Sequence, residues 1–538
     1  MHRHIGFLAL AVCILGCPQT ETVVPDPPVA VPDPVDADGD GLTEAVDCDD
    51  ARPFGVEVPY DGVDNDCDPA TPDDDLDGDG LGLANDCDDT DPAVFLSDDP
   101  FEGDVGVRDL PTFCAYHCSR TVNGHVRISE SSWLEDLSDL HCVTAIEGSL
   151  TITSNFALHS LEGLSGLTRV GALRVVANPN LTSLAGLDGL TRAGGMDIQL
   201  NERLTSLGGH ALTELDGTLL IRHNASLASL AGLDALTRID GSVEIRESPA
   251  LTSLEGLGAL TSIGGGFSVS LSDGLTSLAG LESVTSVGGS VLLANNDSLV
   301  SLEGLNNLES AGAVNLNDLP VASLDGLGSL GSVAFTLSLD TLPHLSSLEG
   351  LEQLASVGHT VQVYGTGVSS LAGLDGLTFV GSDIVVTDNR RLESFDALDQ
   401  LGAIGRHLRV RNNLRLIGLD GLGSLTQVGG DLMIDGDLSG RFVSAELPLL
   451  EEVGGSLVIE ATALPSMDGF STLTTVGADL DLWLNPSLTS IEGLGALTSV
   501  GGDIGIRSNR QLTDHAAQQL VDGIEYVGGT ITISGNEP

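Results

Sequence analysis

Carboxylate side chains recur at fixed intervals in two short stretches near the N-terminus, and their spacing fits calcium ligation. The first stretch places oxygen donors at loop positions 1, 3, 5, 7, 9 and 12 around a glycine: Asp36, Asp38, Asp40, Leu42 through its carbonyl, Glu44 and Asp47. The second stretch has matching donors at Asp75, Asp77, Asp79, Leu81 and Asp86. Hard oxygen donors at these offsets are the ligands that Ca²⁺ prefers. We expect Ca²⁺ sites here; the alternative is an unfolded acidic spacer that binds cations diffusely.

The wider acidic segment also resembles a known repeat. The letters DADGDGLTEAVDCDD and VEVPYDGVDNDCD, within residues 36–92, are similar to a metal-binding repeat of bacterial secreted proteins and, more loosely, to thrombospondin type 3 repeats. The second copy lacks the DGVDNDCD half. The resemblance implies bound Ca²⁺ and a disulfide-braced coil with almost no helix.

Six cysteines precede the main body of the chain, and their even number in an exported protein predicts disulfides. They are Cys48, Cys67, Cys87, Cys114, Cys118 and Cys142. Six cysteines allow fifteen pairings. We favour Cys48 with Cys67, because both flank the aspartates of one acidic copy. Cys118 with Cys142 would then close a cap over the first repeat and leave Cys87 with Cys114.

The first residues predict export and lipid anchoring. Arg3 precedes an apolar run from Ile5 to Leu15, as in a signal peptide that is too short to span a membrane stably. The run ends in Ile-Leu-Gly-Cys, which resembles a bacterial lipobox with Cys17 as the lipidated residue. The alternative is an ordinary signal peptide that happens to contain a cysteine. The proline-rich residues 17–35 suit a semi-extended tether, and Pro18 after the cysteine favours the outer membrane.

Composition excludes several partners and chemistries. The formal net charge is −57 and every one of the 21 basic residues is arginine. Nucleic acids and anionic membrane surfaces are therefore poor partners, so contact with a membrane is expected only through the lipid. The absence of lysine also removes P-loop, Schiff-base and Ser-Lys chemistry.

A leucine-rich repeat with a nearly constant period fills most of the chain. The unit reads LTSLEGLGALTSI at 251–263, and successive copies are separated by 22 to 24 residues. Degenerate copies are expected near Leu134, Val443 and His515, which gives about seventeen copies. A short fixed period is typical of a stacked solenoid, in which each copy covers the apolar face of the next.

Each copy also predicts one β-strand after its glycine pair, as in GSVEIRES at 241–248. Apolar residues alternate with polar ones, which is the pattern of a strand with one buried face. The glycine before the strand would adopt a positive φ in a tight corner, and the asparagine after it would bond its own backbone. Stacked at about 4.8 Å, such strands form a parallel sheet in a rod roughly 80 Å long.

These repeats resemble the leucine-rich repeats of receptor L-domains over residues 130–536. The shared pattern is L-x-x-L-x-x-I/V-x-G-x-L-x-I-x-x-N-x-x-L. The resemblance implies a right-handed parallel β-solenoid, all-β in class, whose sheet can carry a binding surface. The receptor lobes are much shorter, so their ligand footprints cannot be transferred. The segments we expect are a signal peptide at 1–16, a tether at 17–35, an acidic module at 36–110, a cysteine-containing cap at 111–147 and the solenoid at 148–538.

The search for catalytic motifs favours a protein that is not an enzyme. Gly326, Gly328 and Gly331 match G-x-G-x-x-G but lie in the repeat's own connector, without a strand and helix around them. Carboxylate pairs on one strand, Asp479 with Asp481 or Asp431 with Asp435, would suit a solenoid glycan hydrolase. Their adjacency also follows simply from the outer face of a strand.

Outward strand positions are the remaining candidates for function. Exposed aromatic and arginine side chains are typical contacts for proteins or glycans. The ligand-binding candidates are Arg222, Arg246, Tyr364, Arg409, Arg411 and Trp483. Six arginines also fall between Arg390 and Arg415 and could hold an anionic ligand or pair with neighbouring acids. We expect a surface lipoprotein that binds a protein or glycan; the alternative is an envelope spacer without a specific ligand.

Overall fold

The computed structural model describes residues 100–117, 120–209, 211–436 and 439–537. The two predicted Ca²⁺ loops, at 36–47 and 75–86, lie outside these residues. So do several predicted cysteine sites, namely Cys17, Cys48, Cys67, Cys87 and Cys118.

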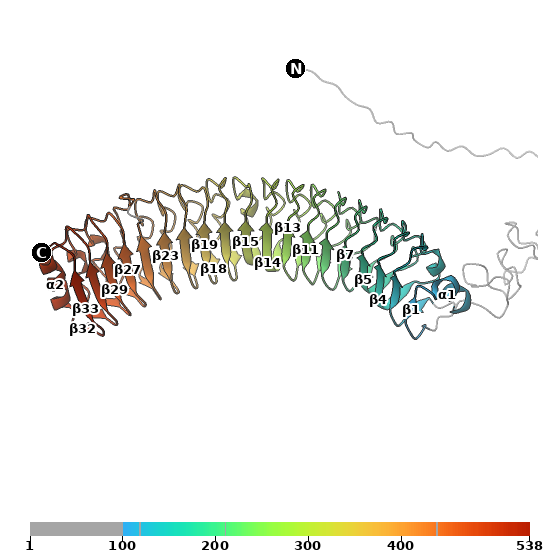
Figure 1. The fold of residues 1–538 in the computed structure, drawn as a ribbon, viewed down its shortest axis with the longest axis horizontal. Helices are drawn as coiled ribbons and strands as arrows, with labels where there is room; N and C mark the ends of the chain where they lie inside the picture. Colours follow the sequence, from blue (N-terminus) through green and yellow to red (C-terminus); the bar gives the residue numbers. More distant parts are fainter. Residues whose placement is uncertain (1–99, 118–119, 210, 437–438, 538) are drawn as a thin grey trace, which may run out of the picture. The chain divides into compact units, whose positions relative to one another are not determined.

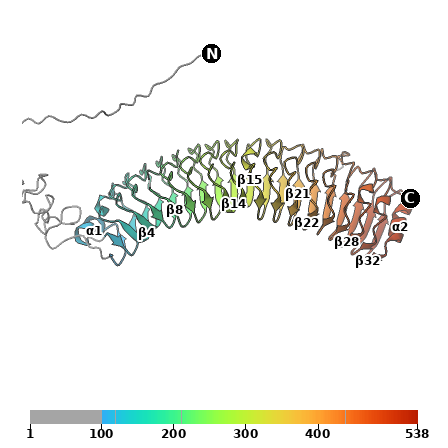
Figure 2. The same cartoon turned by 180° about the vertical axis from the view of Figure 1, so that it is seen from behind.

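The repeat region is a parallel β-solenoid, as the sequence period predicts, and it has about eighteen coils where about seventeen were expected. Figure 1 shows the coils following one another in a single curved row, with the strand arrows along the inner side of the curve. Figure 2 shows the same order from behind, with the connecting loops along the outer side. Coils are also present at the degenerate copies expected near Leu134, Val443 and His515.

Each coil contributes two strand segments, whereas the sequence predicted one. The longer segment follows the glycine pair and forms the main parallel ladder. Its strands are β1 Val105–Gly106, β3 Val126–Ser129, β4 Ala145–Thr153, β5 Arg169–Val176, β7 Met196–Gln199, β9 Leu219–Arg222, β11 Val243–Arg246, β13 Phe267–Ser270, β14 Ser286–Ala294, β15 Ser310–Asn317, β17 Leu337–Asp340, β19 Val361–Tyr364, β21 Ile384–Thr387, β23 Leu408–Arg411, β25 Leu432–Asp435, β27 Leu457–Glu460, β29 Leu480–Trp483, β31 Ile504–Arg507 and β33 Ile531–Ser534.

A second ladder of two-residue strands precedes the glycines, because the apolar residue before each glycine also pairs with its copy one coil away. Its members are β2 Thr121–Val122, β6 Arg192–Ala193, β8 Glu214–Leu215, β10 Arg238–Ile239, β12 Ser262–Ile263, β16 Ser332–Val333, β18 Ser356–Val357, β20 Phe379–Val380, β22 Ala403–Ile404, β24 Gln427–Val428, β26 Glu452–Val453, β28 Thr475–Val476, β30 Ser499–Val500 and β32 Tyr526–Val527. In β4, β5, β14 and β15 the two segments run together as one strand.

The core follows the leucine spacing of the repeat. In the copy at 251–269, Leu251, Leu254, Leu257 and Leu260 are fully buried, as are Phe267 and Val269 on the following strand. The spacing of three in the connector turns each leucine inward, and four coils tighten it into a 3₁₀ turn. These turns are η1 Ser138–Leu140, η2 Asp325–Leu327, η3 Asp468–Phe470 and η4 Glu492–Leu494. One continuous core therefore runs through all the described coils.

Stacking begins before residue 148, in the segments that we assigned to the acidic module and the cap. β1 already pairs in parallel with β3, and the helix α1, Leu110–His117, packs at this end. Its buried face carries Leu110, Phe113 and Cys114, at the i, i+3 and i+4 spacing of a helix.

The predicted pairing of Cys118 with Cys142 is wrong, and so is that of Cys87 with Cys114. A disulfide joins Cys114 to Cys142, with Cα atoms 5.8 Å apart. Because residues 110–117 form a helix, Cys114 is carried on the face that meets the core beside Cys142. The sequence alone does not show which cysteine this short helix carries into the core, and it therefore predicts the wrong partner for Cys142.

The glycine before each strand does not have the positive φ that we predicted. Glycine is required there because the backbones of adjacent coils pass too close for a side chain. A Cβ at Gly194 would lie 1.9 Å from the carbonyl oxygen of Gly171, and a Cβ at Gly405 would lie 2.1 Å from the carbonyl oxygen of Gly381. The positive φ occurs elsewhere in the copy. The glycine of S-L-x-G-L adopts it, as at Gly256 with φ 109°.

A second position with positive φ follows most long strands and is mostly not glycine. Examples are Leu200 at φ 56°, Asn295 at 53° and Asn412 at 54°. This left-handed residue turns the chain inward at the end of the strand.

The asparagine that comes next points into the solenoid and bonds mainly to neighbouring coils, where we predicted a bond to its own backbone. Asn201 is fully buried. Its Oδ1 accepts the backbone N–H of Asn178 at 3.0 Å, and its Nδ2 donates to the carbonyl of Val175 at 2.9 Å. Asn178 adds a weaker bond to its own segment, at Val176, of 3.2 Å. A serine or threonine replaces the asparagine in five coils, at Ser131, Ser248, Ser272, Thr366 and Thr462.

The C-terminal coil replaces the leucine connector with the helix α2, Asp514–Gly523. The Thr513 side chain caps it by accepting the N–H of Ala516 at 3.0 Å. Among the described residues, no helix is both long and apolar enough to cross a membrane.

Candidate binding face

The long strands place two columns of side chains on the outer surface of the sheet. The strands are parallel and in register, so the second and fourth residues of each strand line up with their counterparts in adjacent coils. Every outward residue that the sequence singled out, including Tyr364 and Trp483, is exposed or half-buried at one of these positions. The columns form a ribbed surface with a repeat of about 4.8 Å.

Several charged side chains on this surface pair with one another across coils. Arg174 lies 3.3 Å from Asp197, and Arg507 lies 2.6 Å from Asp481. Two predicted ligand-binding residues are also paired: Arg222 contacts Glu244 of the next coil at 2.5 Å, and Arg246 contacts its sequence neighbour Glu247 in the same coil at 3.2 Å. A partner at Arg222 or Arg246 would have to displace these acids.

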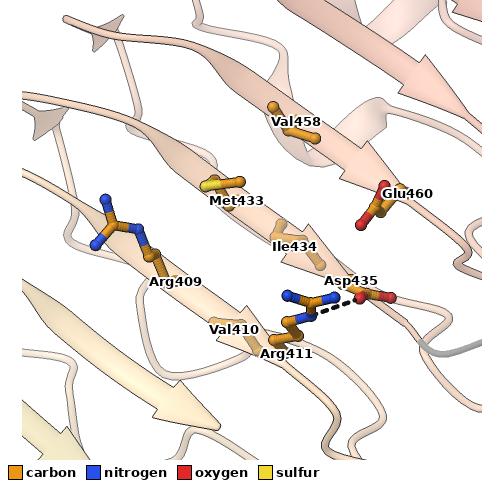
Figure 3. A pocket seen from close by; sticks show the side chains of 8 residues that line it. All are labelled: Arg409, Val410, Arg411, Met433, Ile434, Asp435, Val458 and Glu460. Carbon is orange, nitrogen blue, oxygen red and sulfur yellow. Dashed lines mark hydrogen bonds and ion pairs between the residues drawn. The ribbon is translucent and has the colours of Figure 1, made fainter.

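A hollow of about 260 Å³ opens on the outer face of β23, β25 and β27. We call it the strand-face hollow, and Figure 3 shows its eight lining residues. They are Arg409, Val410, Arg411, Met433, Ile434, Asp435, Val458 and Glu460. The structure thus brings together Arg409 and Arg411, two of the six predicted ligand-binding residues, and adds others that sequence reasoning missed.

The strand-face hollow combines an apolar surface with charges of both signs. Met433 and Val458 follow Arg409 in the column formed by the second strand residues, and Met433 is 38% exposed. Arg411 contacts Asp435 at 3.2 Å, drawn as the dashed line in Figure 3. Arg409 and Glu460 form no ion pair with any other described residue. A binding partner can supply opposite charges to these two side chains and cover the exposed apolar surface beside them.

Two exposed aromatic residues lie on either side of the hollow, in the column of fourth strand residues that also contains Arg411 and Glu460. Tyr364 on β19 precedes Arg411 by two coils, and Trp483 on β29 follows Glu460 by one coil. They are 39% and 38% exposed. At about 4.8 Å per coil, they are roughly 24 Å apart, a span that one protein partner can cover.

The cluster of six arginines is divided between the sheet and the turns. Arg409 and Arg411 are on β23, whereas Arg390, Arg391 and Arg406 are exposed outside the strands. Arg415, the sixth, contacts Glu393 at 3.5 Å. The cluster in the sequence is therefore not one patch in the fold.

The carboxylates considered for hydrolysis have structural hydrogen-bond partners. Asp479 accepts the backbone N–H of Asp503 at 2.7 Å. Asp431 accepts the N–H of Ser456 at 2.9 Å, and its other oxygen lies 3.1 Å from the ring of His407. Asp481 and Asp435 pair with arginines. No group of three or more potential metal ligands occurs within the described residues.

The hydrogen bonds of Asp431 and Asp479 belong to a ladder that sequence reasoning missed. At the position before each of the strands β21, β23, β25, β27, β29 and β31, a side chain accepts the backbone N–H of the next coil. These residues are Asp383, His407, Asp431, Ser456, Asp479 and Asp503. The recurrence of Asp, Ser or His directly after the glycines was the available signal. The outward position of Met433, Val458 and Glu460 could also be predicted, because in the strand register each of them alternates with buried residues.

Comparison with known proteins finds only weak structural similarity. No protein family model matches this chain, and no curated protein matches it significantly in sequence. Among solved structures, an internalin from Listeria monocytogenes aligns with a TM-score of 0.26 and 13% identity, over 72% of this chain and 87% of the internalin. A leucine-rich repeat protein from Leptospira interrogans aligns with a TM-score of 0.24 and 15% identity, over 74% and 95% respectively. Similarity this weak carries no argument about a ligand; the chain's own strands establish a leucine-rich parallel β-solenoid.

Proposed function

We propose that this protein is a recognition protein of the bacterial cell surface that binds a protein or glycan through the outer face of its long strands. The observation that carries the proposal is the strand-face hollow. There, exposed Met433 and half-buried Val458 lie beside Arg409 and Glu460, which have no ion-pair partner among the described residues. A rigid, in-register scaffold holds these groups before a partner arrives, which lowers the entropic cost of binding.

The chemistry of the hollow favours a protein as the partner. A protein surface can supply an acid to Arg409, a base to Glu460 and an apolar side chain to Met433 at the same time. A neutral glycan would leave both charges without a counterion. Tyr364 and Trp483 extend the same face, and aromatic residues are enriched at protein interfaces.

The layout of the chain supports display away from a membrane. We propose that Cys17 is lipidated, that residues 17–35 form a tether and that Ca²⁺ braces the acidic module, with the outer membrane as the destination. Metabolic labelling with palmitate should mark the wild-type protein and not Cys17→Ser, which should also leave the membrane fraction. Equal labelling of both forms would contradict lipid attachment at Cys17.

Binding to protein and glycan arrays tests the proposed recognition surface. The variant Met433→Glu places a charge in the strand-face hollow and should weaken binding to the tightest array ligand at least about tenfold. Leu292→Glu is the matched control: Leu292 holds the same strand position on β14, is 36% exposed and lies far along the sheet.

The outcome separates recognition from the rival function. Loss of binding by Met433→Glu together with retention by Leu292→Glu supports the proposal. If wild type binds nothing on either array, the protein is better described as an envelope spacer. If both variants bind as tightly as wild type, the strand-face hollow is not the binding site.

A further inference from the structure

A second hollow, of about 460 Å³, lies where the chain leaves β19 and β21. We call it the turn hollow. Its lining residues are Thr341, Pro343, Tyr364, Gly365, Thr366, Gly367, Asp388, Arg390 and Arg391. None of them lines the strand-face hollow, so the two hollows are separate sites, although Tyr364 also lies on the outer strand face.

The turn hollow exists because this coil lacks a side chain that other coils carry. Gly365 holds the left-handed position after the strand at φ 63°, where the equivalent residues include Leu200, Leu271 and Leu484. A Cβ built on Gly365 would make only ordinary van der Waals contact, with Thr341 at 3.6 Å, so a side chain fits there without a clash. Gly367, in contrast, is required by the fold, since its Cβ would lie 2.4 Å from the carbonyl oxygen of Pro343.

Two arginines at the turn hollow have no partner in the part of the chain that the structure describes. Arg390 and Arg391 are exposed and make no ion pair or side-chain hydrogen bond there. Asp388 is the one acid in the lining, so the hollow carries a net charge of about +1 in a chain of −57. At physiological ionic strength the Debye length is about 8 Å, so distant acids do not cancel this local charge.

Tyr364 adds an aromatic surface to these cations. Its ring is exposed at the rim, at the end of β19. A guanidinium can bind a carboxylate or sulfate through two parallel hydrogen bonds, and an exposed aromatic ring packs against the apolar face of a sugar. The buried hydroxyl of Thr366 is already used, since it donates to Asn389 at 2.7 Å.

We propose that the turn hollow binds an acidic sugar residue of an oligosaccharide, with the sugar ring on Tyr364 and its carboxylate or sulfate on Arg390 and Arg391. Two cations beside an aspartate suit a ligand with one local negative charge. A nucleic acid needs a longer row of cations along its backbone, and the described solenoid offers no such row at this turn.

Titration calorimetry with defined oligosaccharides tests this site in 0.15 M salt. The probes are a galacturonate tetramer, its uncharged methyl ester, a sulfated galactan tetramer and the neutral galactan tetramer. At least one charged probe should bind at least about tenfold more tightly than its neutral counterpart. Adenosine monophosphate is the comparison ligand, because it combines a negative charge with an aromatic base but is not an acidic oligosaccharide.

Three variants locate the binding. Arg390→Gln with Arg391→Gln should weaken the charged probe at least about tenfold. Gly365→Asn should do the same by filling the hollow, and it is compatible with the fold because Asn295 and Asn412 hold the same left-handed position. Arg510→Gln is the matched control, because Arg510 follows its ladder asparagine as Arg390 follows Asn389.

Three results would overturn the proposal: equal affinity for charged and neutral sugars, wild-type affinity in the Gly365 or double-arginine variant, or tighter binding of adenosine monophosphate. None of them bears on the strand-face hollow, whose variants carry different substitutions and are read on arrays. The two proposals can therefore fail independently.

Discussion

Asp503 shows how a single side chain secures one coil to the next. Its Oδ1 accepts the backbone N–H of Thr530 at 2.6 Å. This bond lowers the pKa of Asp503 from its ordinary value near 3.8, because it favours the charged carboxylate. A carboxyl whose folded pKa is lowered stabilises the fold above its unfolded pKa, and this contribution is lost as the pH falls through the folded pKa.

We predict that Asp503→Asn reduces the acid sensitivity of the C-terminal coils. Wild type should lose stability between neutral pH and values below 3.8, and the variant should lose less over the same interval, because its side chain does not titrate. Thermal unfolding at a series of pH values measures this. An identical pH dependence in both proteins would remove Asp503 from the account.

The positions of single residues could be predicted from the sequence where the repeat pattern fixes which way a side chain points. They could not be predicted where they depend on how separate elements pack together. The outward placement of Tyr364, Arg409 and Trp483 followed from strand alternation and is confirmed. The partner of Cys142 did not follow from any pattern, because it depends on which helical face meets the core. The strand-face hollow also escaped prediction, since it requires knowing which outward side chains leave space unfilled.

At the scale of the repeat, hydrogen bonds between asparagines hold the coils in register. We predict that Asn201→Ala destabilises the protein by about 2 to 5 kcal/mol, because it leaves the N–H of Asn178 and the carbonyl of Val175 buried without partners. Asn201→Ser should cost less, since Ser272 already holds this position in another coil. Chemical denaturation measures both, and equal stability of all three proteins would contradict the ladder's role.

Close contact between glycines fixes the distance between coils at the start of the strands. Gly405→Ala should destabilise by several kcal/mol, because the new Cβ would meet the Gly381 carbonyl oxygen at 2.1 Å and that neighbour is backbone. Gly402→Ala is the control three residues away, where nothing lies within 4 Å. Denaturation midpoints should fall for the first variant only; equal midpoints would show that the coils can separate without cost.

Sequence period and composition were sufficient for the fold of these coils but not for their internal division. Leucines at intervals of three and a strand pattern after each glycine pair fixed the solenoid, since no single copy can bury its own apolar face. The second ladder was missed because each of its strands has two residues, too few to show alternation. The positive φ was predicted for the glycine before the strand but occurs at the glycine of S-L-x-G-L. Sequence does not separate the two, because glycine is used both for a positive φ and where two backbones approach closely.

For the whole molecule, the calcium proposal can be tested on the intact chain. We predict that Ca²⁺ titration of the full-length protein releases heat that is lost in the double variant Asp38→Asn with Asp77→Asn, because each change removes an inner ligand. Asp98→Asn with Asp99→Asn makes the same change of charge outside both loops and should bind as wild type does. Equal reduction in both double variants would indicate diffuse attraction of cations by the acidic segment.

The central claim is that one part of a long, regular sheet is the place where a partner binds. Hydrogen exchange of the full-length protein, with and without its tightest array ligand, tests this claim most directly. Binding should slow exchange in peptides that contain 409–411, 433–435 and 458–460, and should leave the outward face of β13 to β15 unchanged. Protection confined to other coils, or spread evenly along the solenoid, would contradict it.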